Sequence, residues 1–329
     1  MHEAPLFDDV AYGPEGGAAW WLTAADGVRL RVGLWNRQGP KGTILLFPGR
    51  TEYIEKYGRA ATHFAGCGYA TLAIDWRGQG LSDRLTEDAM AGHVHHFIDY
   101  QQDVIAMSEA AKRLDLPRPW YLLAHSMGGC IGLRAVIEGL DVQSCAFSSP
   151  MWGIHMAQAL RPVAWSLSWG SRQLGMSHRY APGTAGEHYV LAEPFETNKL
   201  TNDREMYDDM ARQLRAHPEL GLGGPSLHWL HEALRETRDL ARLPSPALPC
   251  LTILGSDEQI VDVPRVHERM AQWPGGHLDV VPGGRHETLM DTQDMRKRML
   301  QQLCDFYGST ARLGSSGPAP RASAAPQAH

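Results

Sequence analysis

The chain has 329 residues, of which 43% are hydrophobic and 21% are charged, and its formal net charge is −6. This length and composition fit a globular protein with one large domain and room for an insertion. The negative charge argues against a nucleic-acid-binding protein, because neutralising phosphates requires clustered lysine and arginine.

The sequence has no apolar run long enough to span a bilayer, and its first residues lack the basic-then-apolar order of a signal peptide. The five cysteines lack paired spacing, and each falls in or beside a predicted element. We therefore expect buried free thiols rather than disulfides or metal ligands. Together these features favour a cytoplasmic location. The cysteines are Cys67, Cys130, Cys145, Cys250 and Cys304.

The first part of the chain alternates predicted strands and helices. Residues 18–23 and 28–35 form a predicted hairpin joined through Asp26 and Gly27. Residues 43–47 are apolar throughout, which is typical of a central strand. The pattern then predicts a helix over about 54–65, a strand over 69–74, a helix over 97–114 and a strand over 144–148.

A strand, a sharp turn and a helix surround Ser126. Residues 120–124 are an apolar run typical of a buried strand, and residues 130–137 have helical spacing. This arrangement predicts a nucleophile elbow, in which the turn lifts the serine hydroxyl off the sheet. The usual pattern is G-x-S-x-G, and Ala124 stands at its first position, which we interpret as a tolerated variant.

Residues 150–249 differ from the rest, because they are rich in tryptophan and methionine and show no strand alternation. We interpret them as an inserted helical cap rather than a second independent domain, since a strand resumes at Cys250. Later elements are predicted over 251–254 (strand), 263–272 (helix), 277–281 (strand) and 288–307 (helix). The predicted organisation is core 1–149, cap 150–248, core 249–308, and a disordered Ser/Ala/Pro/Gly-rich tail 309–329. Strands that alternate with helices predict an α/β fold with a mostly parallel sheet and helices on both faces.

A serine nucleophile needs a base that is oriented by a carboxylate. His286 is the candidate base among sixteen histidines, because it follows the last strand on a glycine-rich loop and completes the order Ser, acid, His. The candidate acid is Glu258, which lies three residues after the loop glycine Gly255. Asp257, on a shifted loop, is the alternative.

Two backbone N–H groups are expected to bind the oxyanion, one from Met127 and one from Arg50 in the loop after residues 43–47. His93, His95 and His96 could suggest a metal site, but a polar loop is the simpler interpretation. We therefore expect neither a metal nor a cofactor.

Four segments of the chain are similar to bacterial lysophospholipases in the monoacylglycerol lipase branch of the α/β-hydrolases. The resemblance spans about residues 20–307 and is weakest in the predicted cap. It implies the α/β-hydrolase fold and hydrolysis of a carboxylic ester with a long acyl chain. The segments are Pro-Gly-Arg-Thr-Glu-Tyr-Ile-Glu-Lys-Tyr (48–57), Ile-Asp-Trp-Arg-Gly-Gln-Gly-Leu-Ser (74–82), Ala-His-Ser-Met-Gly-Gly (124–129) and Pro-Gly-Gly-Arg-His-Glu (282–287).

The predicted function is thus a serine hydrolase that cleaves a lysophospholipid or a monoacylglycerol through an acyl-enzyme. A short-chain carboxylesterase or an acyltransferase would use the same residues and stays open. Epoxide hydrolases and dehalogenases need a carboxylate where Ser126 stands, and a non-catalytic binding protein would be expected to lack one of the three residues. The expected partner is a small acyl ester, with no nucleic acid and with peripheral contact to lipid at the inner membrane. The sequence does not indicate the oligomeric state.

Overall fold

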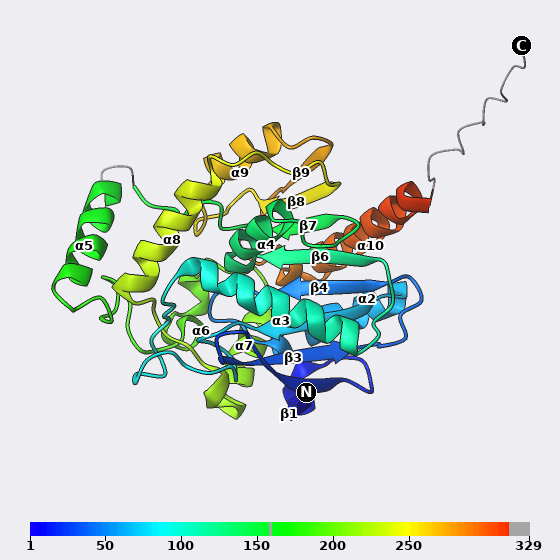
Figure 1. Cartoon of the computed structure of the whole chain (residues 1–329), viewed down its shortest axis with the longest axis horizontal. Helices are drawn as coiled ribbons and strands as arrows, with labels where there is room; N and C mark the ends of the chain where they lie inside the picture. The colour runs from blue at the N-terminus through cyan, green and yellow to red at the C-terminus, as the bar shows by residue number, and fades with distance from the viewer. Residues whose placement is uncertain (158–159, 316–329) are drawn as a thin grey trace, which may run out of the picture.

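The computed structural model describes residues 1–157 and 160–315. Its described residues form one nine-stranded sheet in the order β1-β2-β3-β5-β4-β6-β7-β8-β9 (Figure 1). The first three strands pair antiparallel, β3 also pairs antiparallel with β5, and the remaining strands are parallel. The strands are β1 His2–Ala4, β2 Ala18–Thr23, β3 Arg29–Trp35, β4 Thr43–Phe47, β5 Ala70–Asp75, β6 Trp120–His125, β7 Cys145–Ser148, β8 Cys250–Gly255 and β9 Gly276–Val281.

Helices connect most of the parallel strands, as right-handed crossovers require. The α-helices are α1 Asp8–Ala11, α2 Gly58–Cys67, α3 Tyr100–Arg113, α4 Met127–Ile137, α5 Arg161–Gln173, α6 Tyr189–Ala192, α7 Arg204–Ala216, α8 Leu227–Leu240, α9 Val263–Ala271 and α10 Gln293–Ser315. Short 3₁₀ helices occupy Ile54–Tyr57, Phe97–Asp99, Phe195–Thr197, Pro218–Leu220 and Thr288–Met290.

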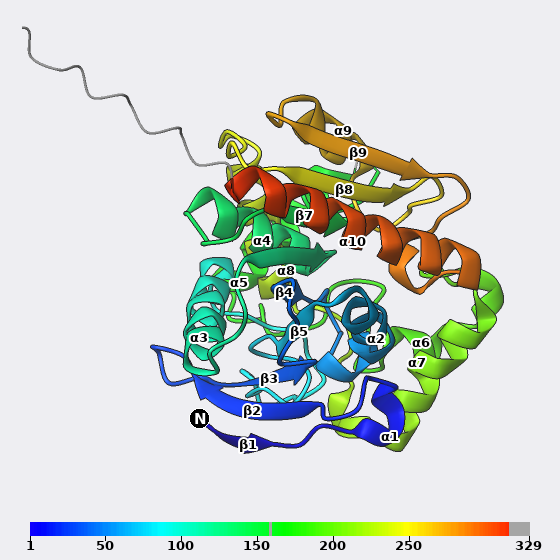
Figure 2. The ribbon, with the colours of Figure 1, turned by 90° about the vertical axis from the view of Figure 1, so that its right-hand side faces the viewer.

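Apolar side chains alternate between the two faces of the sheet. In β4, Leu45 and Phe47 pack in the same cluster as α3, α4 and α9, whereas Ile44 and Leu46 pack with α2 and α10. Figure 2 shows α2 and α10 on the same side of the sheet. Both faces are therefore covered, which explains why the central strands are apolar throughout. The predicted α/β-hydrolase architecture is confirmed.

Parallel pairing brings several functional loops to one edge of the sheet. Strands β4 and β6 are in register from Thr43 with Trp120 to Phe47 with Ala124, and β8 pairs with β9 farther along the same sheet. The loops that follow β4, β6, β8 and β9 therefore leave the sheet at the same, carboxyl edge. In an open α/β sheet this edge is where ligands bind.

The residues between β7 and β8, which are neighbours in the sheet, form α5, α6, α7 and α8. Helix α5 packs along α8 and lies at the left margin of Figure 1. The described part of this insertion is thus mostly helical and contains no strand of the sheet. Among the described residues, no helix is both long and apolar enough to cross a membrane.

The predicted tail was placed too early. Helix α10 continues to Ser315, so residues 309–315 are helical, whereas 316–329 lie outside the described residues. The helix continues because Thr310 is buried at 3% exposure and its hydroxyl lies 2.8 Å from that of Ser144. Composition alone gave no sign of this tertiary contact.

The expectation for the cysteines is also partly wrong. Cys67 at the end of α2 and Cys304 in α10 form a disulfide, although 237 positions separate them in the sequence. The cause is the packing of α2 against α10, which no local spacing reveals. Cys130, Cys145 and Cys250 are buried free thiols, as expected.

Candidate active site

Ser126 occupies the turn between β6 and α4. Its backbone angles are φ 50° and ψ −118°, a strained conformation for a residue with a side chain. A Cβ at Gly128 would lie 2.1 Å from the carbonyl oxygen of Phe47, so only glycine fits there. Ala124 is accommodated because it faces Gly132, where an added Cβ would stand 3.0 Å from the alanine methyl. The turn therefore has the geometry of a nucleophile elbow despite the alanine.

His286 connects the serine to a carboxylate. Its Nε2 lies 3.0 Å from Ser126 Oγ, and its Nδ1 lies 2.7 Å from Glu258 Oε2. The other oxygen of Glu258 accepts hydrogen bonds from the backbone N–H groups of Ile260 and Val261, at 2.6 and 3.1 Å. Burial alone would raise the pKa of Glu258, but the charge of His286 and these donors outweigh it and lower the pKa to about 2. Glu258 is therefore held as a carboxylate.

Asp257, the alternative acid, does not reach the histidine. Its side chain is exposed and accepts a hydrogen bond from the Ser256 hydroxyl at 2.9 Å. The structure thus brings Ser126, His286 and Glu258 together and leaves Asp257 in solvent.

The loop after β4 faces the elbow. Gln79 donates from Nε2 to the carbonyl oxygens of Gly49 and Glu52, at 2.8 and 3.1 Å, and fixes the loop. Within the described residues, the backbone N–H groups of Arg50 and Met127 donate to no other residue. Both amides are therefore free to bind a negatively charged oxygen.

Residues 38–293 match the family described as "Serine aminopeptidase, S33". The chain belongs to this α/β-hydrolase family. It is 32% identical over 299 residues to lysophospholipase L2 of Escherichia coli (strain K12), covering 87% of this chain and 86% of that protein. It is 29% identical over 265 residues to the probable lysophospholipase L2 of Haemophilus influenzae, covering 80% and 82%.

Solved structures share the fold of this family member. A soluble variant of monoglyceride lipase from Saccharomyces cerevisiae aligns with a TM-score of 0.69 at 18% identity, covering 88% of this chain and 94% of that chain. A thermostable carboxyl esterase from Bacillus coagulans also aligns with a TM-score of 0.69, at 14% identity, covering 91% and 100%.

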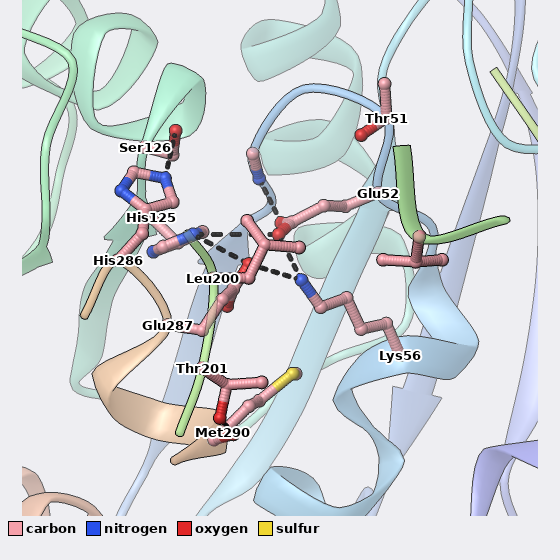
Figure 3. A network of polar contacts seen from close by, with 12 residues as sticks. Thr51, Glu52, Lys56, His125, Ser126, Leu200, Thr201, His286, Glu287 and Met290 are labelled. Carbon is pink, nitrogen blue, oxygen red and sulfur yellow. Dashed lines mark hydrogen bonds and ion pairs between the residues drawn. The ribbon is translucent and has the colours of Figure 1, made fainter. Parts of the chain in front are cut away.

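Behind Ser126 and His286, this hydrolase has a buried charge cluster that sequence reasoning missed. It comprises Glu52, Lys56, His125 and Glu287 (Figure 3). The ammonium of Lys56 donates to Glu287 at 2.6 Å and also to Glu52. His125 Nδ1 lies 3.0 Å from the carbonyl oxygen of Ser148 and so donates to it, while Nε2 faces Glu287 at 3.4 Å. The cluster links the residues that adjoin Ser126 and His286 to the loop after β4.

The charges of this cluster balance within it. Burial would lower the pKa of His125, but Glu287 and Glu52 outweigh it and raise the pKa. Burial would raise the pKa of Glu287, but Lys56 and His125 lower it well below its usual value. Ligand atoms of Glu52, His125 and Glu287 lie within 4.8 Å of one another, as a metal site would require. Lys56 already binds both carboxylates, so the cluster does not fit a metal.

One sequence signal could have revealed part of this cluster. Glu52 and Lys56 are four residues apart, the spacing of an ion pair on one helical turn. Glu287 directly follows His286, and His125 directly precedes Ser126.

The histidine-rich loop with His93, His95 and His96 lies outside this charge cluster. His93 Nδ1 lies 2.9 Å from the hydroxyl of Ser226, and burial lowers the pKa of His93 to about 4.

A cavity of about 350 Å³ opens beside Ser126. Trp229 is the one tryptophan of the insertion that lines it among the described residues, whereas Trp152 is packed in the core and Trp169 is 58% exposed. The apolar lining comes from both the sheet loops and the insertion. Its apolar members are Met151, Ile154, Val190, Leu200, Met210, Pro225, Trp229, Leu230, Ile260 and Val261.

Proposed function

We propose that this protein hydrolyses the carboxylic ester of an acyl lipid, a lysophospholipid or a monoacylglycerol, through an acyl-enzyme on Ser126. One observation carries the proposal. The hydrogen-bonded series Ser126, His286, Glu258 ends at the wall of an apolar cavity. The curated relatives are called lysophospholipases, which supports an acyl-lipid substrate.

In the proposed mechanism, Ser126 Oγ attacks the ester carbonyl while its proton moves to Nε2 of His286. Glu258 holds the imidazole and stabilises its positive charge. The carbonyl oxygen becomes an oxyanion bound by the N–H groups of Arg50 and Met127. The C–O bond then breaks, and the alcohol leaves with the proton from His286. Water then gives a proton to the same histidine and attacks the acyl carbonyl. The bond between the acyl carbon and Ser126 Oγ breaks, Oγ takes the proton back from His286, and the fatty acid leaves.

The family description names an aminopeptidase, but the cavity does not favour that reaction. A free α-amino group would need an available carboxylate. Glu52 and Glu287 are the carboxylates that line the cavity within the described part of the chain, and Lys56 and His125 already neutralise them.

We further propose that residues 150–248 act as a cap that contacts lipid at a membrane surface. A row of large apolar side chains on and beside α5 is exposed, which suits insertion into an interface. The row consists of Leu160, Val163, Leu167 and Leu174, whose spacing places them on one face of the helix. Free thiols were one reason to expect a cytoplasmic location, and Cys67 and Cys304 no longer support it, because they form a disulfide. The proposed contact with the inner membrane therefore rests on the exposed apolar surface alone.

A series of esters from C2 to C16, kept below micelle-forming concentrations, tests the substrate. Each methylene buried in the cavity contributes about 0.8 kcal/mol, so kcat/KM should rise by up to about fourfold per methylene until the cavity is full. A maximum at C2 to C4 would favour a short-chain carboxylesterase instead. Product analysis with added glycerol distinguishes an acyltransferase, which would form new ester in place of free fatty acid.

A further inference from the structure

The side chain of Arg50 enters the cavity without an anionic partner. Its Nη1 donates to the carbonyl oxygen of Gly223 at 2.8 Å, and its guanidinium lies 5.7 Å from the ring centre of Trp229. No carboxylate of the described residues lies within 4.0 Å of it. The other guanidinium N–H groups have no acceptor in the described part of the chain, and Arg50 is one of the residues that line the cavity beside Ser126.

Two fully buried arginines elsewhere in the chain, Arg31 and Arg77, are neutralised by carboxylates. Arg31 contacts the carboxylates of Glu55 and Asp75 at 2.8 and 2.7 Å. Arg77 contacts Asp103 at 2.7 Å and a second aspartate at 2.6 Å. This is the usual arrangement, because an unpaired buried charge is costly. Arg50 departs from it at the wall of the active-site cavity.

A bound anion would compensate the positive charge of Arg50. Burial lowers the pKa of its guanidinium to about 10, a direct sign that the charge lacks compensation. At neutral pH the group is still a cation. The two cavity carboxylates, Glu52 and Glu287, are bound to Lys56 and do not repel an incoming anion strongly. A planar guanidinium with free N–H groups matches the oxygens of a phosphate.

The position along the substrate also fits. The backbone N–H of Arg50 is one proposed donor to the ester carbonyl, and the side chain of the same residue ends in the guanidinium. The length of this side chain therefore sets the distance between the two groups. In a lysophospholipid, the number of bonds from the ester oxygen to phosphorus equals the number from Cα to Cζ in arginine. The two spans are therefore comparable in length, as the proposal requires.

We propose that the Arg50 guanidinium binds the phosphodiester of a lysophospholipid head group and makes this class, rather than uncharged monoacylglycerol, the preferred substrate. This inference rests on the proposed function. The Ser126, His286 and Glu258 side chains would act on both lipids in the same way, so the side chain of Arg50 would distinguish a lysophospholipid from a monoacylglycerol.

The test compares two lipids with the same acyl chain, 1-lauroyl lysophosphatidylcholine and 1-lauroylglycerol, as monomers. For Arg50→Met, the ratio of their kcat/KM values should fall by about tenfold to a hundredfold, the effect of losing a charge-assisted hydrogen bond. Arg50→Lys keeps the positive charge but lacks the planar, two-pronged set of N–H donors, so its ratio should lie between those of Arg50→Met and the wild type. In a Ser126→Ala background, Arg50→Met should weaken binding of dodecylphosphocholine by a similar factor.

Arg84 provides a matched control. It is also half-buried, and it binds the carbonyl oxygens of Gly78 and Gly221 at 2.8 and 2.9 Å, but it does not line the cavity. Arg84→Met should leave the ratio unchanged. If Arg50→Met lowers both activities equally, or if Arg84→Met changes the ratio as much, Arg50 is only a structural link to the insertion and the inference is wrong. Failure of the wild-type protein to hydrolyse either lipid would instead reject the proposed function.

Discussion

At the scale of single residues, Glu258 and Asp257 are adjacent yet occupy opposite environments. The side chain of Glu258 is buried against His286, whereas Asp257 is exposed. The backbone N–H groups of Ile260 and Val261 fix one Glu258 oxygen and leave the other for the histidine. The geometry therefore favours Glu258 as the acid of the proposed triad.

Substitution of each acid by its amide distinguishes the roles of Glu258 and Asp257. Glu258→Gln keeps the size of the side chain but removes the charge that stabilises the imidazolium, so kcat should fall by about four orders of magnitude. Asp257→Asn is the matched control and should stay within about threefold of wild type, since surface substitutions have small effects. Ester hydrolysis by purified variants provides the measurement. The reverse ranking would move the role to Asp257.

At the scale of elements, the elbow depends on close contact between α4 and the end of β4. A Cβ at Gly128 would meet the carbonyl oxygens of Phe47 and Pro48 at 2.1 and 2.4 Å. These atoms directly precede the loop that contains Arg50. Relief of this clash must therefore move either Ser126 or the proposed oxyanion donors.

Gly128→Ala should accordingly lower the free energy of unfolding by about 1–3 kcal/mol, the usual cost of overpacking, and should reduce kcat. Gly170→Ala in α5 is the control, because a Cβ there meets nothing within 4 Å. Urea unfolding and ester hydrolysis measure the two effects. Equal stability and activity in both variants would show that the elbow tolerates displacement.

Local patterns were enough to predict every strand except β1, because burial and alternation are properties of consecutive residues, whereas β1 has three residues and is largely exposed. The hairpin through Asp26 and Gly27 and the turn at Ser126 follow from such patterns. Contacts between distant segments were not predictable in this way. The disulfide between Cys67 and Cys304 joins two helices, and the helical extension to Ser315 includes a contact with Ser144, which lies just before β7 and far away in the chain.

The candidate site was also predicted only where local patterns were sufficient. Ser126 and His286 could be named from the loops they occupy, whereas the choice of Glu258 over Asp257 required the direction of two side chains. The charge cluster around Lys56 was missed, because its members come from three separate segments of the chain. The hydrogen bonds between those segments appear only in the folded chain.

At the scale of the whole molecule, six of the twelve exposed large apolar residues among those described lie on or beside α5, at the margin of the fold (Figure 1). Helix α8, which packs along α5, also contributes Trp229 to the active-site cavity. This continuity suits a protein whose proposed substrate comes from a lipid surface.

Substitution of this surface should weaken membrane binding. The pair Val163→Glu and Leu174→Glu should reduce partitioning to phospholipid vesicles by at least about tenfold, because each buried large apolar side chain contributes about 1.5–3 kcal/mol. Ile105→Glu on α3 is the control, since Ile105 is 63% exposed but lies outside this row. Co-sedimentation measures the partitioning. Equal binding by all three proteins would contradict a lipid contact at α5.

The most direct test of acyl-lipid hydrolysis through Ser126 is the rate of fatty-acid release from 1-lauroyl lysophosphatidylcholine by wild type and Ser126→Ala. We expect release by the wild type and a loss of roughly four to six orders of magnitude in the variant, as when a triad nucleophile is removed. Retention of more than about a hundredth of the wild-type rate would contradict the central claim.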